Sequence, residues 1–253
     1  MPDGFVKTGD ASDLPRFEAE AAGLEVLRKA GAVRVPAVHS VGMKDGRARI
    51  ELEFLDLRGL DRASGTLLGR QLAELHRHVA DRYGFDNDNY IGGSPQQNGW
   101  RDEWPKFFAE RRLGPQLRWA VERGMDRKLA EQGESLASRL GAFFLDYRPR
   151  PSLLHGDLWG GNASALPDGT PVVFDPAVYY GDREADIAMT ELFGGFPESF
   201  HAAYRESWPL DAGYEVRKTL YNLYHVLNHF NLFGAGYLGQ ARRMIGTLLV
   251  ELA

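Results

Sequence analysis

Cysteine is absent from the 253-residue sequence. Disulfide bonds, thiolate metal sites and cysteine nucleophiles are therefore excluded for these residues. Long apolar runs are absent too, since no stretch reaches the roughly 18 residues that a membrane-spanning helix needs. The first residues also lack the apolar segment of a secretion signal. We therefore expect a cytoplasmic protein with no membrane partner.

Positive charge is not in excess either. Lys and Arg number 30 against 35 Asp and Glu, which gives a net charge of −5. Nucleic acid is therefore not expected as a partner, because binding to polyanions relies on clustered basic side chains. The apolar content of 43% and the charged content of 26% are ordinary for a globular protein. The length suffices for one large domain or two smaller lobes.

The apolar periodicity changes along the chain from strand-like to helical. Residues 5–8 are typical of a strand and residues 13–30 of a helix, whereas 35–38 and 48–55 resemble two strands joined by a Lys44-Asp45-Gly46 turn. Helical spacing dominates from Thr66 onward, and four of the expected helices cover 134–146, 183–193, 214–232 and 237–252. This order predicts an α+β protein with a small strand-rich lobe, 1–56, and a larger helical lobe, 57–253.

One polar stretch, LLHGDLWGGN at 153–162, carries the chemistry. Asp157 and Asn162 lie in it five positions apart, and Asp175 follows an apolar strand thirteen residues later. Carboxylate and amide oxygens are the ligands that Mg²⁺ takes, usually together with substrate phosphates. The H-x-D-x₄-N pattern with a later strand-borne Asp is typical of protein-kinase-like phosphotransferases, whose first Asp accepts the proton of the attacking hydroxyl. We therefore predict an ATP- and Mg²⁺-dependent small-molecule kinase with a bilobal, protein-kinase-like fold.

A kinase also needs a lysine on the phosphates and an acid that fixes this lysine. Lys7 lies on the first expected strand, and Glu20 lies on the apolar stripe of the helix that follows, where an unpaired carboxylate would be costly. We expect these two side chains to pair; a solvated Glu20 at the edge of the stripe is the alternative. The backbone of Glu53 to Leu55, at the end of the last strand of the small lobe, is placed to bind adenine.

Other residues near the motif have competing interpretations. His155 is expected to pack the loop rather than to act as an acid or base. Trp159 fits either the core or a substrate contact, and we favour the substrate. Asp186 fits either a solvated helix acid or an acceptor for backbone N–H groups of the catalytic loop. We favour the second interpretation, with Glu184 more open to solvent.

Whole segments of the sequence resemble the fructosamine kinase (ketosamine-3-kinase) family, in the aminoglycoside-phosphotransferase-like branch of the kinase fold. The resemblance covers about residues 4–240 and rests on LLHGDLWGGN, VVFDPAVYYGDREADIAMTELFGGF, LYNLYHVLNHFNLFGAGY, FEAEAAGLEVL, YIGGSPQQNGW and WPKFFAERRL. It implies transfer of the ATP γ-phosphate to the 3-hydroxyl of a ketosamine, on a small amine or a glycated protein lysine, as a step of deglycation. It also implies roles for six residues: Asp157 as base, Asn162 and Asp175 on the metal, Lys7 with Glu20 on the phosphates, and Trp159 in the sugar pocket.

The sequence departs from this family at its start. Family members carry a glycine-containing hairpin ahead of the lysine strand, and only six residues precede Lys7 here. Either the native protein extends upstream of these residues, or its start is truncated. In the second case we expect weak nucleotide binding and a sheet edge that is free to pair with another chain. Two other functions stay open, an aminoglycoside- or choline-type kinase and a non-catalytic binding remnant.

Overall fold

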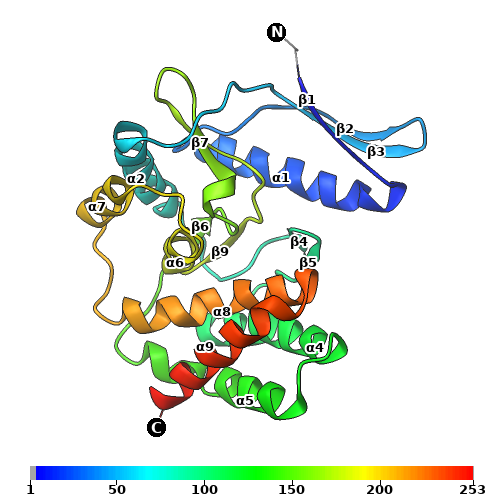
Figure 1. Cartoon of the computed structure of the whole chain (residues 1–253). Coiled ribbons are helices and arrows are strands. Elements are labelled where there is room, and N and C mark those ends of the chain that lie inside the picture. The colour runs from blue at the N-terminus through cyan, green and yellow to red at the C-terminus, as the bar shows by residue number, and fades with distance from the viewer. Residues whose placement is uncertain (1–3, 253) are drawn as a thin grey trace.

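The computed structural model describes residues 4–252, and it begins with an antiparallel three-stranded sheet backed by a long helix (Figure 1). Strands β1 (Phe5–Gly9), β2 (Val38–Lys44) and β3 (Arg47–Leu52) lie in the order β1-β3-β2. Helix α1 (Leu14–Ala30) covers one face of this sheet. Its apolar stripe packs against alternate residues of β3 in one core: Phe17, Leu24, Leu27, Ala48, Ile50 and Leu52.

The ends of these elements differ in part from the expectation. A 3₁₀ turn (Ala11–Asp13) precedes α1, and Asp10 and Asp13 cap that turn reciprocally. Gly31 ends α1 in the left-handed conformation (φ 67°), as its sequence predicts. Residues 35–37 lie outside β2, because Pro36 has no N–H for a ladder. Residues 53–55 lie outside β3, since the Glu53 N–H donates to the Ala37 carbonyl instead (2.8 Å).

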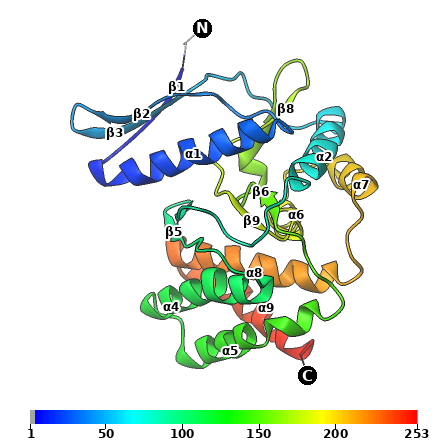
Figure 2. The ribbon, with the colours of Figure 1, turned by 180° about the vertical axis from the view of Figure 1, so that it is seen from behind.

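The helical part begins with α2 (Arg62–His76), which starts at a capping box. There the N–H of Ser64 donates to the Asp61 carboxylate (2.8 Å). Helix α2 packs closely on α7 (Glu198–Ser207), because Gly69 presents no side chain to it. Figures 1 and 2 show the two helices side by side. Val79 lies beyond the end of this helix and is exposed.

The chain also forms three short antiparallel strand pairs. They are β4 (Asn89–Ile91) with β5 (Ser94–Gln96), β6 (Ser152–Leu154) with β9 (Tyr179–Gly181), and β7 (Ala163–Ala165) with β8 (Pro171–Val173). The first pair makes a hairpin within the stretch 84–100, which the sequence indicates only as an ordered loop. Two of the pairs, near the labels β5, β6 and β9, lie between the sheet and the lower helices in Figure 2, and the pair near β8 rises to the level of the sheet.

The remaining helices form the lower half of the molecule in Figure 1. They are α3 (Trp104–Phe108), a π-helical turn (Ala109–Leu113), α4 (Gly114–Glu122), α5 (Arg127–Ser138), α6 (Glu184–Leu192), α8 (Tyr214–Phe233) and α9 (Leu238–Val250). The expected helix at 134–146 is wrong, because α5 ends at Ser138 and a 3₁₀ helix covers Leu140–Phe144. Helix α7 was not anticipated.

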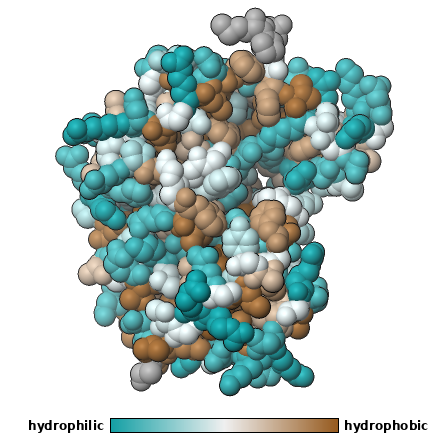
Figure 3. Space-filling model, in the orientation of Figure 1, coloured by the Kyte–Doolittle hydropathy of each residue, from teal (hydrophilic) through white to brown (hydrophobic). Residues whose placement is uncertain are grey.

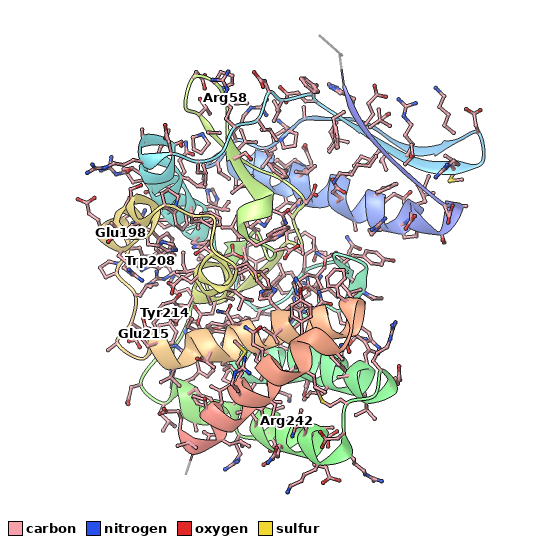
Figure 4. The ribbon with its side chains drawn as sticks, viewed as in Figure 1. Arg58, Glu198, Trp208, Tyr214, Glu215 and Arg242 are labelled. Carbon is pink, nitrogen blue, oxygen red and sulfur yellow. The ribbon has the colours of Figure 1, made fainter. Side chains whose placement is uncertain are left out.

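Aromatic and polar side chains tie the helices to one another. Tyr214 at the start of α8 donates to Glu191 of α6 (2.9 Å), and the Arg183 guanidinium lies 4.3 Å from the ring centre of Trp208 beyond α7 (Figure 4). Glu184 is fully buried and bonded to Arg217 (2.8 Å), so the expectation that it is open to solvent is wrong. A buried carboxylate requires such a partner, and the periodicity of α6 does not reveal an arginine on α8.

Two hydrophobic clusters make up the core. One joins the sheet and α1 to Leu68 and Leu72 of α2 and to Phe200 of α7, and the other lies among the lower helices. The first cluster therefore crosses residue 56, and a lobe division at that residue stays a prediction. Within residues 4–252, none of the helices combines the length and apolarity that crossing a bilayer requires.

Candidate active site

The stretch 153–162 forms a loop at the end of β6. The turn depends on Gly156, which has φ +82° and whose missing Cβ would lie 2.0 Å from the Ala177 carbonyl oxygen. Only glycine fits both constraints. The turn directs the Asp157 side chain into a cavity of about 470 Å³.

Asp186 fixes the backbone of this loop from below. Its carboxylate accepts hydrogen bonds from the N–H groups of His155 (2.7 Å) and Gly156 (2.9 Å). It also lies 3.2 Å from Nε2 of His76, which must be the protonated nitrogen because a carboxylate only accepts. Burial alone would raise the pKa of Asp186, but the bond from His76 and the loop N–H group hold it below the usual range. The carboxylate therefore stays charged as an anchor for the loop.

His76, on α2, is a part of the site that sequence reasoning missed. It is fully buried, and its Nδ1 lies 2.7 Å from the Tyr204 hydroxyl. Because Nε2 carries the proton, Nδ1 accepts from that hydroxyl. Burial lowers the pKa of His76, which keeps the ring neutral. A lone histidine at the end of a predicted helix gives no signal that it contacts Asp186, which lies 110 residues further along the chain.

His155 packs the loop from within. It is fully buried, and its Nε2 lies 3.0 Å from the Phe174 carbonyl, so this nitrogen donates. Its Nδ1 accepts from the N–H of Asp157 (3.3 Å). Both ring nitrogens are thus engaged with backbone, and burial lowers the pKa of the ring. This arrangement holds the catalytic loop against the segment that leads to Asp175.

Asp157 has the properties of a general base. Burial raises its pKa to about 7, the charges of Asp175 and Asp186 add to this shift, and the hydrogen bond from Asn162 opposes it. The Asn162 amide donates to the backbone oxygen of Asp157 (2.8 Å) and to its carboxylate (3.3 Å). A carboxylate whose pKa lies near neutrality can hold and release a proton at working pH.

Asn162 and Asp175 meet beside Asp157, and both carry side-chain oxygens of the kind that Mg²⁺ takes as ligands. The Asn162 amide nitrogen also reaches the Asp175 carbonyl (3.4 Å), while its side-chain oxygen accepts no hydrogen bond among the described residues. Asp175 adopts φ 55°, uncommon for a non-glycine residue, and its side chain is 43% exposed. Residues 4–252 hold no cluster of three or more His, Asp or Glu suited to a metal. One carboxylate and one amide oxygen fit Mg²⁺, which takes its other ligands from phosphates and water.

Lys7 connects the sheet to this acidic group. Its Nζ lies 2.8 Å from Glu20 on α1 and also pairs with the Asp175 carboxylate. Burial by itself would lower the pKa of Lys7, but Glu20 and Asp175 together raise it, so the ammonium stays charged. The pair expected between Lys7 and Glu20 therefore forms, and it faces the metal-ligand candidates rather than the bulk solvent.

The larger cavity lies between α1, the β4–β5 hairpin, the catalytic loop and the end of α8. Trp159 lines it and is 41% exposed, which places its ring at the opening and not in the core. His229 and Phe233 of α8 line the opposite side. In Figure 3 the outline of the molecule is indented below the overhanging β2–β3 hairpin, on the side where α1 faces the end of α8.

A second cavity of about 320 Å³ lies behind β1 and shares Lys7 and Asp175 with the first. Its walls are mostly apolar and include Phe5, Leu52, Phe54, Leu57 and Phe174. Nη2 of Arg34 donates to both carboxylate oxygens of Glu53 (2.5 Å). The carbonyl of Glu53 and the N–H of Leu55 have no hydrogen-bond partner among the described residues. An apolar slot edged by a free acceptor and a free donor suits a flat heterocycle such as adenine.

The fold is that of kinase-like phosphotransferases, and a carboxylate of raised pKa, a lysine–acid pair and further side-chain oxygens meet at the junction of two cavities. A choline/ethanolamine kinase family protein from Mesorhizobium loti shares this fold, with a TM-score of 0.59 at 14% identity over 98% of this chain and 82% of that one. The fructosamine kinase profile matches residues 2–251, and this chain belongs to the fructosamine kinase family. The resemblance and the kinase-like α+β fold are thereby confirmed.

Individual relatives agree with this assignment. A probable ketoamine kinase of Vibrio cholerae is 46% identical over 97% of this chain and 84% of its own length. The chloroplastic protein-ribulosamine 3-kinase of Arabidopsis thaliana is 42% identical over 97% and 76%. The crystal structure of a protein assigned as a fructosamine-3-kinase from Thermobifida fusca superposes with a TM-score of 0.87 at 35% identity, over 98% and 85%. The chain is thus a phosphotransferase with an alcohol acceptor, and its family uses ATP.

Proposed function

We propose that this chain transfers the γ-phosphate of ATP to the 3-hydroxyl of a ketosamine, a ribulosamine or fructosamine borne by a small amine or a protein lysine. The family and the names of its relatives support this substrate class. The phosphorylated adduct would then separate from the amine, which makes the reaction a deglycation step. We propose that nucleotide binds in a lobe over residues 1–56 and that the acceptor binds against residues 57–253.

In this proposal each polar group of the site has one task. Asp157 orients the attacking hydroxyl and takes its proton as the oxygen–phosphorus bond forms and ADP leaves. Lys7, held by Glu20, binds the phosphates. Asn162 and Asp175 would hold Mg²⁺, which neutralises the developing charge on the phosphate oxygens when bound.

Three residues complete the proposed binding sites. Adenine would lie in the apolar cavity, with hydrogen bonds to the Glu53 carbonyl and the Leu55 N–H. Trp159, at the mouth of the larger cavity, would stack on the sugar of the acceptor. His155 and Asp186 contribute by holding the loop that carries Asp157.

The observation that carries the proposal is the convergence of the two cavities. Asp157 lines the larger one, and Lys7 and Asp175 line both. A nucleotide that enters from the smaller cavity therefore presents its phosphates beside Asp157, whose pKa burial raises to about 7. In-line transfer requires this adjacency of base and phosphate.

A coupled ADP-release assay tests the proposal. We expect ATP turnover with a synthetic ribulosamine or fructosamine, no turnover with free ribose or fructose, and loss of turnover when EDTA removes divalent metal. Phosphorus NMR of the product should place the new ester at position 3. Turnover only with an aminoglycoside or choline would replace the ketosamine assignment. Calorimetry that detects no Mg-ATP binding at millimolar nucleotide would favour the non-catalytic remnant.

A further inference from the structure

A buried arginine, Arg112, lies outside the site described above. Its side chain is 0% exposed, and its hydrogen-bond partners among the described residues are all neutral: the Gln97 carbonyl (2.6 Å), the Asn98 side-chain oxygen (2.7 Å) and the Arg111 carbonyl (3.0 Å). A buried charge without a counter-ion is costly. A charged side chain that is buried at this cost in free energy is a candidate for a specific structural or functional role.

Aromatic faces supply the remaining compensation for this charge. The guanidinium carbon lies 4.0 Å from the ring centre of Tyr179, 4.7 Å from that of Phe107 and 5.9 Å from that of Tyr224. Cation–π contacts of this kind strengthen when they are desolvated. Tyr179 belongs to β9, which pairs with the strand that leads into the catalytic loop. Arg112 thus joins the lower helices to the strands below the active site.

The local backbone around Arg112 is unusual as well. Residues Ala109–Leu113 form a π-helical turn between α3 and α4. Such turns are rare and often occur at functional sites, because the extra residue redirects one side chain. Here the redirected side chain contacts the stretch 84–100. The proposed reaction assigns no role to that stretch.

Arg112 is the first member of a buried hydrogen-bond network. The Asn98 amide, which accepts from Arg112, donates to the side-chain oxygen of Asn89 (2.8 Å), and Gln96 donates to the same oxygen (2.9 Å). Asn89 donates in turn to the Val178 carbonyl (2.8 Å), and Tyr224 donates to Gln96 (2.8 Å). The network therefore fixes both strands of the β4–β5 hairpin to the segment that follows Asp175.

The hairpin held in this way forms one wall of the larger cavity. Asn89, Tyr90, Ile91 and Gly92 line that cavity, and none of the hairpin residues lines the smaller, apolar one. The missing Cβ of Gly92 would lie 3.5 Å from Leu232 of α8, so the tip of the hairpin closes against the end of that helix. The wall therefore borders the cavity assigned to the acceptor and not the one assigned to adenine.

We propose that Arg112 is a positioning residue that sets the acceptor wall, by locking the β4–β5 hairpin through Asn98 and Asn89. It touches neither substrate. The kinetic part of this inference rests on the proposed function, whereas the structural part, the locking of the hairpin, does not.

The test compares Arg112→Met with the matched control Arg111→Met, in the full chain. Arg111 is the adjacent residue in the same π turn. Its guanidinium donates to the side chain of Gln97 (3.1 Å) and lies beside Gly99, but it makes no hydrogen bond to Asn98 or Asn89 among the described residues. We expect Arg112→Met to speed hydrogen–deuterium exchange in peptides covering 84–100. We also expect it to raise the KM for a ribulosamine about tenfold, equivalent to one charged hydrogen bond. The KM for ATP should stay unchanged, and Arg111→Met should change none of these quantities.

If Arg112→Met fails to fold, a second variant still tests the inference. Arg112→Lys keeps the charge and the apolar stem but loses the planar fork, so it should show the same two changes to a smaller degree. Unchanged exchange in 84–100 in a folded variant overturns the locking role. Faster exchange with an unchanged acceptor KM, or with an equal rise in the KM for ATP, overturns the role as acceptor wall. A wild-type chain without ketosamine kinase activity would refute the proposed function alone, because the exchange comparison still decides the locking role.

Discussion

Asp157→Asn is expected to lower turnover by orders of magnitude while it stabilises the fold. The amide has the shape of the carboxylate but cannot accept the proton of the attacking hydroxyl. Removing a positioned general base costs about 10²–10⁴-fold in rate, and we expect kcat to fall within that range. The neighbouring contacts of Asn162 are polar and neutral, so the loop should keep its conformation.

The stability gain follows from the electrostatics of the site. Burial and the charges of Asp175 and Asp186 raise the pKa of Asp157 from its ordinary value of 3.8 to about 7. The folded state therefore binds this proton more tightly than the unfolded state, and the unfolding free energy falls as pH rises from about 4 to 7. A difference of this size between the pKa values of the folded and unfolded states corresponds to about 4 kcal/mol of unfolding free energy for a fully buried group. Because Asp157 opens into a cavity, we expect about half, ~2 kcal/mol.

Urea denaturation at several pH values, in EDTA to exclude metal effects, measures this difference. The advantage of Asp157→Asn over wild type should be small at pH 4 and should grow to ~2 kcal/mol by pH 8. Asp168→Asn is the matched control, since Asp168 is exposed in the β7–β8 turn and accepts from the Thr170 N–H (2.9 Å). That control should keep full turnover and show no such gain. Wild-type turnover in Asp157→Asn would refute the reasoning, and so would a difference in unfolding free energy that does not change with pH.

Three further changes test other parts of the site. Lys7→Met should lower kcat/KM for ATP about 10²-fold, because the cation that Glu20 and Asp175 hold in place is lost; initial rates against ATP measure this. An undiminished rate would remove Lys7 from the phosphate site. Gly156→Ala should lower the unfolding free energy by ~2 kcal/mol or more, since its Cβ meets the Ala177 carbonyl at φ +82°, and thermal denaturation would show it. A variant as stable as wild type would show that the loop relaxes freely. Trp159→Ala should raise the KM for the ketosamine about tenfold while Trp159→Phe retains most of the affinity. Equal values for Ala and Phe would argue against stacking.

Much of the fold follows from local patterns in the sequence. The helix 13–30 is recognisable because its stripe has the helical period and Gly31 ends it. The Asp45-Gly46 turn, the strand that bears Lys7 and the helices α6, α8 and α9 follow from equally local rules. The helix expected at 134–146 fails, since apolar spacing continues through a break at Ser138 that only the surrounding packing determines.

Some residues of the site could likewise be predicted from local patterns in the sequence, and others could not. Asp157, Asn162 and Asp175 lie within one short motif, and their spacing alone indicates a metal and a base. The sequence could not predict the structural roles of His76, Glu184 and Arg112, because each role depends on a partner that is distant in the chain. His76 meets Asp186, Glu184 meets Arg217, and Arg112 meets the loop at Asn98.

The sequence by itself therefore determined the chemical groups of the site and the family to which they belong. Local spacing suffices for that, because the reacting groups sit on one loop and on the strands and helix next to it. Only the tertiary structure decided how these groups are held in place and how their pKa values are shifted. Burial raises the pKa of Asp157, Gly156 turns it into the cavity, and side chains from α2 and the π turn support the loop and the hairpin. Burial and long-range contact are properties of the folded chain, and no spacing of residues encodes them directly.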